Sequence, residues 1–504
     1  MEEKMTKIVE HLINGQNVSG VEDRHQDVFN PATGEVTKRV ALASKATMEE
    51  AISTAEAAFP AWRNTSPAKR AQVMFKLKVL LEEHSETICN MITDEHGKVH
   101  DDAMGELTRA IENVEFACGA PQLLKGEHSK NVGTGVDSWS EFQSLGVVAG
   151  ITPFNFPAMV PFWMWPLAVV CGNTFILKPS EKTPSASLFM GQLALEAGLP
   201  AGVLNVVMGD KEAVDTILND PRVQAVSFVG STPIAEYIYT TATANGKRVQ
   251  ALGGAKNHGI LMPDADIDNA VSAIMGAAYG SCGERCMALP VIVAVGDETG
   301  DAVVEKIKTE LAVMKVGSGR DAKNDMGPLV SKEHFEKVKG YVDLGVEEGA
   351  TLVVDGRNIV IEGYENGFFL GGCLFDNVTP EMKIYKDEIF GPVLCIVRVK
   401  TQQEAMNLID SHEYGNGTCI FTRDGESARY FTDNIKVGMV GVNVPLPVPV
   451  SYHSFGGWKR SLFGDLSMYG PDGVRFWTRR KTVTQRWPSA SMREGSSFSF
   501  PSNK

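Results

Sequence analysis

Two cysteines in a glycine-rich run are the side chains of this sequence best suited to nucleophilic chemistry. Cys282 and Cys286 lie in the run Gly280-Ser281-Cys282-Gly283-Glu284-Arg285-Cys286-Met287, directly after a predicted helix that ends near Tyr279. A cation beside a thiol lowers its pKa, whereas the negative end of a helix dipole disfavours the thiolate. Arg285 adjoins Cys286 and Cys282 lies nearer the helix end, so Cys286 is the stronger candidate nucleophile. The competing interpretation is that both are small buried apolar side chains, the commoner fate of cysteine. A zinc site would need a second ligand pair, and the sequence has none nearby.

Asn155 is the candidate for stabilising negative charge on a reacting oxygen. It stands in Thr152-Pro153-Phe154-Asn155-Phe156-Pro157, within a stretch from Phe142 to Leu177 that holds no charged residue. A buried amide must find hydrogen-bond partners, so a loop asparagine satisfied by its surroundings is the default interpretation. The functional interpretation is an oxyanion donor.

Two further motifs could bind the phosphates and ribose of a dinucleotide. In Phe228-Val229-Gly230-Ser231-Thr232-Pro233 a predicted strand turns through Gly230 and opens a helix at Ser231. A helix start offers free N–H groups and a positive dipole to a pyrophosphate, although a Ser/Thr cap before proline is also ordinary helix initiation. Lys178 and Glu181 follow another predicted strand, where an acid can hold ribose hydroxyls. A solvated strand-end lysine is the alternative there.

His96 and His100 are spaced so that one helix face could present both to a metal ion. No third ligand is evident, and Gly97 weakens a helix between them. The sequence therefore predicts a solvated helix surface and no metal site.

The elements that would position these residues alternate between short apolar strands and helices. Strands are predicted at residues 146–151, 174–177, 203–207 and 225–229. One intervening helix is marked by Thr183 as its cap, Pro184 in its first turn and Gly198 after its end. This alternation indicates a parallel sheet covered on both faces. The uncharged stretch is long enough to cross a bilayer, but its four prolines favour a buried loop and helix between strands.

A second α/β region is predicted from about residue 259 to 440, with helices at 267–279 and 301–313 and strands at 291–295 and 393–397. An earlier helical pattern covers residues 67–92. Segments near 123–141 and 474–487 alternate in polarity, which predicts a protruding strand pair for subunit pairing. The expected fold class is therefore α/β, with two parallel-sheet lobes and a protruding oligomerisation strand pair.

Composition and charge narrow the class of protein. The chain has 504 residues, 43 % of them hydrophobic, and a net charge of −14, which opposes the basic footprint of nucleic-acid binding. Eight scattered cysteines fit reduced thiols better than a disulfide framework. The charged N-terminus Met1-Glu2-Glu3-Lys4 resembles neither a signal nor a transit peptide. We expect a cytoplasmic protein with no membrane or nucleic-acid partner.

Together the motifs resemble the aldehyde dehydrogenase superfamily, in order over nearly the whole chain. The matching runs also include Glu388-Ile389-Phe390-Gly391-Pro392 and Phe455-Gly456-Gly457-Trp458-Lys459. The resemblance implies that Cys286 attacks an aldehyde, that Asn155 stabilises the oxyanion and that NAD accepts the hydride. The residues it implies as NAD ligands are Thr152, Phe154, Lys178, Glu181, Gly209, Gly230, Ser231, Glu388 and Phe390.

One departure from the superfamily pattern indicates a branch. Hydrolytic members carry a Glu-Leu-Gly-Gly run whose glutamate activates water, and we interpret the run here as Ala251-Leu252-Gly253-Gly254. With residues 254–258 and 283–288, this resembles the CoA-acylating methylmalonate-semialdehyde dehydrogenase branch, which includes malonate-semialdehyde dehydrogenases and is associated with valine and inositol catabolism. Relatives in that branch often carry asparagine where Ala251 stands.

The branch resemblance implies coenzyme A as co-substrate and loss of the substrate carboxylate, giving propionyl-CoA or acetyl-CoA. It also implies that Arg109 and Arg285 bind that carboxylate, Arg109 being otherwise an exposed helix cation. The rivals are a hydrolytic semialdehyde dehydrogenase releasing a free acid, a non-catalytic protein on the same fold, and a cysteine hydrolase.

The resemblance also implies a domain plan. Residues 1–123 and 142–252 would form the NAD-binding domain and residues 253–441 the catalytic domain. Residues 124–141 and 474–495 would form an oligomerisation element, and residues 442–473 would return to the cofactor lobe. A homodimer or homotetramer is expected.

Overall fold

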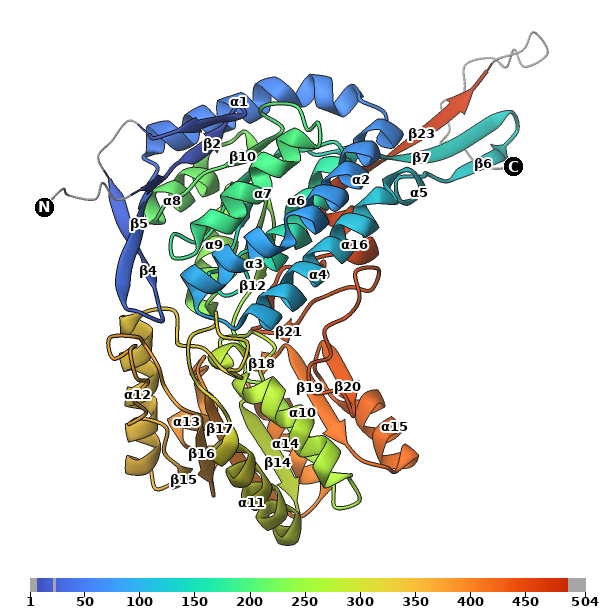
Figure 1. Cartoon of the computed structure of the whole chain (residues 1–504). Helices are drawn as coiled ribbons and strands as arrows, with labels where there is room; N and C mark the ends of the chain where they lie inside the picture. Colours follow the sequence, from blue (N-terminus) through green and yellow to red (C-terminus); the bar gives the residue numbers. More distant parts are fainter. Residues whose placement is uncertain (1–6, 21–23, 488–504) are drawn as a thin grey trace, which may run out of the picture.

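The structure is a computed structural model that describes residues 7–20 and 24–487 of the chain. Two α/β bodies lie one above the other, and a narrow arm of strands leaves the upper body (Figure 1). The predicted runs at 146–151, 174–177, 203–207 and 225–229 become neighbouring strands of the upper sheet. These are β8 (Val147–Ile151), β9 (Thr174–Lys178), β10 (Leu204–Val206) and β11 (Val223–Val229).

The upper sheet, within the described residues, has the strand order β22-β12-β11-β8-β9-β10-β2-β3. Its central strands from β12 to β10 are parallel, and the edge strands pair antiparallel. Short apolar strands of this kind need cover on both faces. The remaining bounds are β12 (Arg248–Leu252), β22 (Leu462–Phe463), β2 (His11–Ile13) and β3 (Gln16–Val18).

Helices cover both faces of this sheet. On one face α1, α8 and α9 pack into an apolar cluster with Ala149 and Val226, and on the other α2, α3, α4, α6 and α7 pack into a larger cluster. The helices are α1 (Lys45–Asn64), α2 (Pro67–Glu83), α3 (Ser85–His96), α4 (His100–Cys118), α5 (Ala120–Leu123), α6 (Met159–Val170), α7 (Pro184–Glu196), α8 (Lys211–Asn219), α9 (Thr232–Ala244) and α16 (Gly470–Phe476).

The uncharged stretch lies inside this body, as its prolines predicted. Every residue of α6 is buried between the sheet and the surrounding helices. No helix among the described residues is long and apolar enough to cross a membrane.

Two local predictions need correction. The helical pattern at 67–92 is two helices, because the chain breaks at His84 (φ −101°, ψ 14°) between α2 and α3. Thr183 is the N-cap residue of α7 as predicted, but its side chain makes no capping hydrogen bond. Its hydroxyl donates instead to the carbonyl oxygen of Phe154 at 3.0 Å, which ties the start of α7 to the loop after β8.

The lower body contains the second predicted α/β region. Its sheet, among the residues described, has the order β15-β16-β17-β14-β13-β19-β20, and only β15 pairs antiparallel. Its strands are β13 (His258–Leu261), β14 (Val291–Val295), β15 (Thr351–Val354), β16 (Cys373–Asp376), β17 (Val393–Val399), β19 (Gly417–Phe421) and β20 (Met439–Val442). Its helices are α10 (Ile267–Tyr279), α11 (Asp297–Val313), α12 (Lys332–Glu347), α13 (Lys383–Lys386), α14 (Gln402–Ser411) and α15 (Gly425–Asn434).

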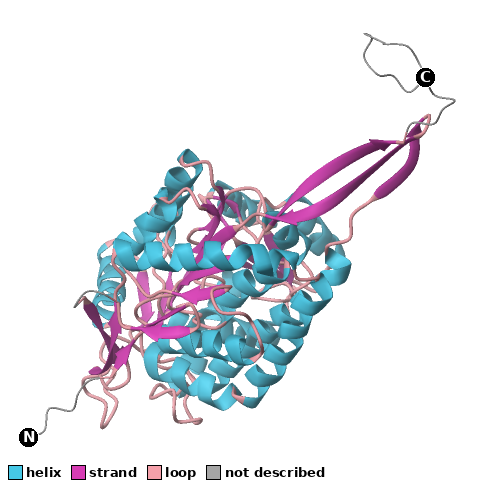
Figure 2. Cartoon of the chain, turned by 90° about the horizontal axis from the view of Figure 1, so that it is seen from above, coloured by secondary structure: helices cyan, strands magenta, loops and turns pink. Residues whose placement is uncertain are grey.

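The arm has three strands where the sequence predicted two. Strand β7 (Val136–Ser144) lies between β6 (His128–Gly133) and β23 (Thr478–Arg486), both antiparallel to it. Figure 2 shows the three strands projecting away from the helical body. Residues 474–476 belong to α16 instead of the arm, and positions 488–495 of the predicted element lie outside the described residues.

Short strands complete the fold. A small sheet near the N-terminus has the order β1-β5-β4 (Ile8–Val9, Glu35–Ala41, His25–Asn30), and β18 (Tyr414–Gly415) pairs with β21 (Trp458–Lys459).

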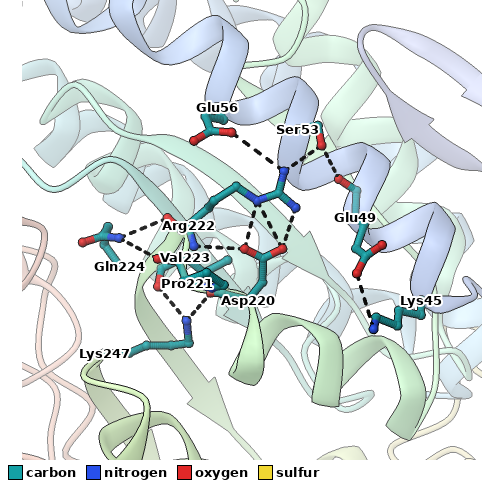
Figure 3. A network of polar contacts seen from close by, with 10 residues as sticks. All are labelled: Lys45, Glu49, Ser53, Glu56, Asp220, Pro221, Arg222, Val223, Gln224 and Lys247. Atoms are coloured by element: carbon teal, nitrogen blue, oxygen red, sulfur yellow. Dashed lines mark hydrogen bonds and ion pairs between the residues drawn. The ribbon is translucent and has the colours of Figure 1, made fainter.

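A polar network fixes the amino ends of β11 and β12 (Figure 3). Arg222 donates to both carboxylate oxygens of Asp220, with its shortest contact at 2.6 Å, and reaches Ser53 of α1 at 2.8 Å. Lys247 Nζ donates to the backbone oxygens of Asp220 and Val223. The opposite, carboxyl edge of the sheet is left for the polar loops described next.

Candidate active site

Parallel strands bring several predicted ligands to one edge of the upper sheet. Thr152, Lys178 and Gly230 stand at or just after the ends of β8, β9 and β11. The Thr152 N–H donates to the Lys178 carbonyl at 3.1 Å, and the Gly230 N–H donates to Leu252 O at 3.1 Å. The carboxyl ends of parallel strands are where α/β proteins bind ligands.

Cys286 is carried by a tight turn that follows α10. Ser281, Cys282 and Gly283 have φ values of 54°, 53° and 73°, a left-handed run that is costly for the two residues other than glycine. A Cβ at Gly283 would lie 2.2 Å from the carbonyl oxygen of Gly391. The turn therefore packs tightly against the loop that contains Glu388.

Two asparagines outside the predicted set hold the Cys286 backbone. Asn257 Nδ2 donates to the Cys286 carbonyl at 2.9 Å, and Asn416 Nδ2 donates to the same oxygen at 3.0 Å. In the sequence, Asn257 stood out only as a polar residue immediately before the buried strand β13. Asn416 is the single residue between β18 and β19 and belongs to no motif that the sequence offered, so sequence reasoning missed both roles.

Two cavities meet at Cys286. One, of about 430 Å³, is lined mostly by apolar side chains together with Arg109 and Arg285. The other, of about 210 Å³, is lined by Phe154, Asn155, Gly230, Ser231, Glu388 and Phe390 among others. We call them the substrate cavity and the cofactor cavity. A nucleophile that lines both can bring a substrate carbon next to a second bound group.

Burial of the Cys286 thiol disfavours its ionised form. Burial raises the pKa of Cys286 to about 12, and the nearby Glu388 carboxylate adds to the rise. Arg285 lowers this pKa as predicted, but its effect is the smallest of those acting on the thiol. The predicted influence of Arg285 is therefore right in direction but small, because desolvation outweighs a guanidinium that is turned toward Asp102.

Cys282 is a poorer nucleophile than Cys286 for a different reason. It is 0 % exposed and packs within the core of the lower body. Burial raises its pKa well above the ordinary range. This placement supports the choice of Cys286.

Asn155 is held from both sides. The residue is 3 % exposed. Its side-chain Nδ2 donates to the backbone carbonyl oxygen of Glu284 at 2.9 Å, and its backbone carbonyl oxygen accepts from Lys98 Nζ at 2.6 Å. Glu284 lies two residues before Cys286, so the amide is directed at the cysteine loop. Its second hydrogen can serve an oxyanion at the thiol.

The cofactor cavity is lined by several of the residues predicted to bind a dinucleotide. Ser231 precedes the first residue of α9, and a Cβ at Gly230 would lie 2.5 Å from the ring of Phe228, so glycine keeps the helix start open. Glu388 accepts from the Ala255 N–H at 3.0 Å, and burial raises its pKa to about 7. Phe390, at φ 63°, accepts at its carbonyl from His334 Nε2 at 2.6 Å.

The other predicted cofactor ligands lie farther along the same edge. Lys178 and Glu181 form an ion pair at 3.2 Å. The two cavities at Cys286 are not lined by this ion pair, by Thr152 or by Gly209. Gly209 packs closely on α8, where a Cβ would lie 2.4 Å from that of Ala213. A part of the dinucleotide remote from the thiol would be needed to reach them.

Both predicted substrate arginines line the substrate cavity, and both are already paired. Arg109 Nη1 lies 2.7 Å from Glu112 Oε2 and its Nη2 donates to the carbonyls of Val448 and Pro449. Arg285 Nη2 lies 2.5 Å from Asp102 Oδ1. The two arginines thus line one mostly apolar cavity, with their guanidinium groups held by neighbouring oxygen atoms.

Ala251 does not line either cavity at Cys286. Alternate residues of a strand face opposite sides of a sheet. Ala251 packs with Phe228 and Val249 in the cluster under α8 and α9, whereas Leu252 packs in the cluster that Cys286 contacts. Gly253 lines the cofactor cavity with Cys286. The loop near the Cys286 thiol therefore consists of Leu252, Gly253 and Gly254. None of these residues has a side chain that could act as a base.

The prediction of a solvated surface at His96 was also wrong. His96 is 0 % exposed, ends α3, and lies 3.5 Å from Glu284 Oε2. His100 begins α4 after the left-handed Gly97, so the two rings do not share a helix face. Among the residues described, no group of three His, Cys, Asp or Glu side chains could hold a metal ion.

Known proteins share this fold. Residues 18–483 match the aldehyde dehydrogenase family, and the chain belongs to that family. It is 66 % identical over 492 residues to malonate-semialdehyde dehydrogenase of Pseudomonas aeruginosa, covering 98 % of this chain and 99 % of that protein.

Two solved structures agree. One, methylmalonate-semialdehyde dehydrogenase from Oceanimonas doudoroffii, is 68 % identical with a TM-score of 0.95 and covers 97 % of this chain and 100 % of that one. The other, a Sinorhizobium meliloti protein assigned to the same activity and solved with NAD, is 54 % identical with a TM-score of 0.96, covering 97 % and 99 %. The predicted family and α/β fold class are confirmed.

Proposed function

We propose that the protein is an NAD-dependent, CoA-acylating semialdehyde dehydrogenase that acts on malonate semialdehyde, methylmalonate semialdehyde or both. The observation that carries the proposal is that Cys286 lines both a cavity with two arginines and a cavity with the dinucleotide-binding motifs. The names of the relatives at 66–68 % identity support the same substrates.

The chain's own residues account for the acylation step. Arg109 and Arg285 bind the substrate carboxylate, since a guanidinium fork can grip both oxygens. This places the aldehyde carbon at the Cys286 thiol, and Asn155 donates to the oxygen that becomes negative. Bound NAD supplies a hydride acceptor, held by Glu388, Phe390 and the start of α9. A thioester on Cys286 results.

Coenzyme A then takes the acyl group. The loop 252–254 passes the thiol without an ionisable side chain, so water has no base there. A thiol ionises far more readily than water and exchanges one thioester for another. The substrate carboxylate is lost as CO₂ or bicarbonate, and the products are acetyl-CoA or propionyl-CoA.

The hydrolytic rival rests on Glu388. Its carboxyl group lines the cofactor cavity with Cys286 and has a pKa raised by burial to about 7, which suits a general base. In this rival Glu388 would activate water and release a free acid. The same residue is needed for the dinucleotide in the proposed mechanism.

Product analysis separates the two functions. Each semialdehyde is incubated with enzyme, NAD and CoA, and the products are identified by mass spectrometry. The proposal predicts acetyl-CoA or propionyl-CoA in amounts equal to the NADH formed. Free acid equal to the NADH, with CoA unconsumed, would establish the hydrolytic rival.

The assembly and compartment are part of the proposal. Strand β23 lies at the edge of the arm sheet, and no other described strand pairs with its outer side. This edge can join the sheet of a second copy, which supports a homodimer or homotetramer. All eight cysteines are free thiols, which supports a reducing cytoplasm. Light scattering of the purified protein would test the assembly.

A further inference from the structure

A buried ion pair beside Asn155 is not used by the chemistry described above. Lys98 Nζ lies 2.8 Å from Glu106 Oε2, and both side chains are 0 % exposed. Lys98 stands in the turn between α3 and α4, and Glu106 lies on α4. A buried pair is weak evidence for stability because both charges lose their hydration. Its contacts suggest a different purpose.

The pair binds both ends of the turn that carries Asn155. Lys98 Nζ donates to the Asn155 carbonyl at 2.6 Å. Glu106 Oε1 accepts from the N–H groups of Ala158 and Met159 at 2.7 and 3.1 Å, where α6 begins. One ion pair therefore connects the first and last residues of the segment 155–159.

This arrangement determines where the Asn155 side chain lies. Lys98 holds the backbone carbonyl of Asn155, and the side-chain amide of Asn155 points toward the Glu284 carbonyl in the cysteine loop. Glu106 forms part of the wall of the substrate cavity, but both of its oxygens already accept hydrogen bonds. The pair thus acts on the amide rather than on the substrate.

We propose that Lys98 and Glu106 are positioning residues that hold Asn155 in place as the oxyanion donor. The inference rests on the proposed role of Asn155 in acylation. A displacement of a reacting group by about 1 Å can cost about 10²-fold in rate. Loss of the Lys98–Glu106 ion pair should therefore slow acylation without changing the Cys286 thiol or the cofactor cavity.

The test is the double variant Lys98→Met with Glu106→Gln. It removes both charges together, which a fold tolerates better than one unpaired buried charge, and the introduced glutamine keeps an oxygen acceptor for the start of α6. The matched control is Lys78→Met with Glu82→Gln, the same pair of changes in an ion pair on α2 whose side chains are 28 % and 49 % exposed. The acylation rate is read from the first NADH turnover after rapid mixing.

We expect the Lys98→Met, Glu106→Gln variant to be acylated about 10- to 100-fold more slowly than the wild type. Its NAD affinity and the alkylation of its Cys286 by iodoacetamide should be unchanged. The control should match the wild type. In an Asn155→Ala background the same double change should slow acylation by less than about threefold, because the group it positions is gone.

An unchanged rate in the wild-type background would overturn the proposal. So would equal slowing with and without Asn155, since the pair would then act independently of the amide. If the double variant does not fold, Glu106→Asp serves in the same cycle, because it keeps both charges while the shorter side chain cannot reach Lys98 and the start of α6 together. If Asn155→Ala alone leaves acylation fast, the role of Asn155 fails first and the inference falls with it.

Discussion

The side-chain nitrogen Nδ2 of Asn155 lies 2.9 Å from the backbone carbonyl oxygen of Glu284, two residues before Cys286. This bond joins the loop after β8 in the upper body to the turn after α10 in the lower body. The oxyanion donor and the nucleophile therefore share one hydrogen-bonded contact across the two bodies.

Asn155→Ala should lower kcat by about 10²- to 10³-fold, because the lost donor acts on charge that develops in the transition state. Steady-state kinetics on the carboxylated semialdehyde would measure this, with circular dichroism to verify the fold. A folded variant with near-wild-type acylation would remove Asn155 from the mechanism.

Replacement of the two cysteines should have opposite results. Cys286→Ala should abolish acylation while NAD still binds, whereas Cys282→Ala should retain substantial activity because Cys282 lies in the core. NADH formation and NAD titration on both proteins provide the comparison. An active Cys286→Ala protein would show that the wrong thiol was chosen.

The free enzyme should be alkylated slowly at neutral pH. Burial raises the pKa of the Cys286 thiol to about 12, so the thiolate fraction rises with pH throughout the range below that value. The rate of iodoacetamide modification at Cys286 should increase about tenfold per pH unit from 7 to 10. A plateau beginning near pH 7 or 8 would mean that the thiol is activated before substrate binds.

Arg109→Leu should raise KM for a carboxylated semialdehyde far more than for propanal, because only the former carries the group that a guanidinium grips. Arg475→Leu is a suitable control, since Arg475 is an exposed arginine paired only with Asp472 among the described residues. Equal increases for both aldehydes would reject Arg109 as a carboxylate ligand.

Two glycines with similar φ values should respond differently to alanine. Gly246 (φ 71°) has open space around a Cβ, so Gly246→Ala should cost about 1 kcal/mol of unfolding free energy from backbone strain alone. Gly283 (φ 73°) would place a Cβ 2.2 Å from Gly391 O, so Gly283→Ala should cost about 2–4 kcal/mol. Urea unfolding would measure both, and equal losses would contradict tight packing of the cysteine turn.

Local sequence patterns predicted much of this molecule, because strand runs, helix starts and motif residues are set by neighbours in the chain. The parallel strands and the choice of Cys286 and Asn155 as candidates follow from such patterns, whereas Glu388 was identified only through the family resemblance. Two predictions failed for different reasons. His96 is buried by chain that is distant in sequence and lies 3.5 Å from Glu284 Oε2. The arm has a third strand because residues 128–144 fold back as the hairpin of β6 and β7 instead of forming one strand.

The central claim is that a thioester on Cys286 is resolved by CoA and not by water. Enzyme, NAD and semialdehyde are mixed rapidly without CoA, and NADH is followed before and after CoA is added. The account predicts a burst no larger than the active-site concentration, then a slow phase, and steady turnover once CoA is present. Fast, sustained NADH formation with free acid as product in the absence of CoA would contradict it.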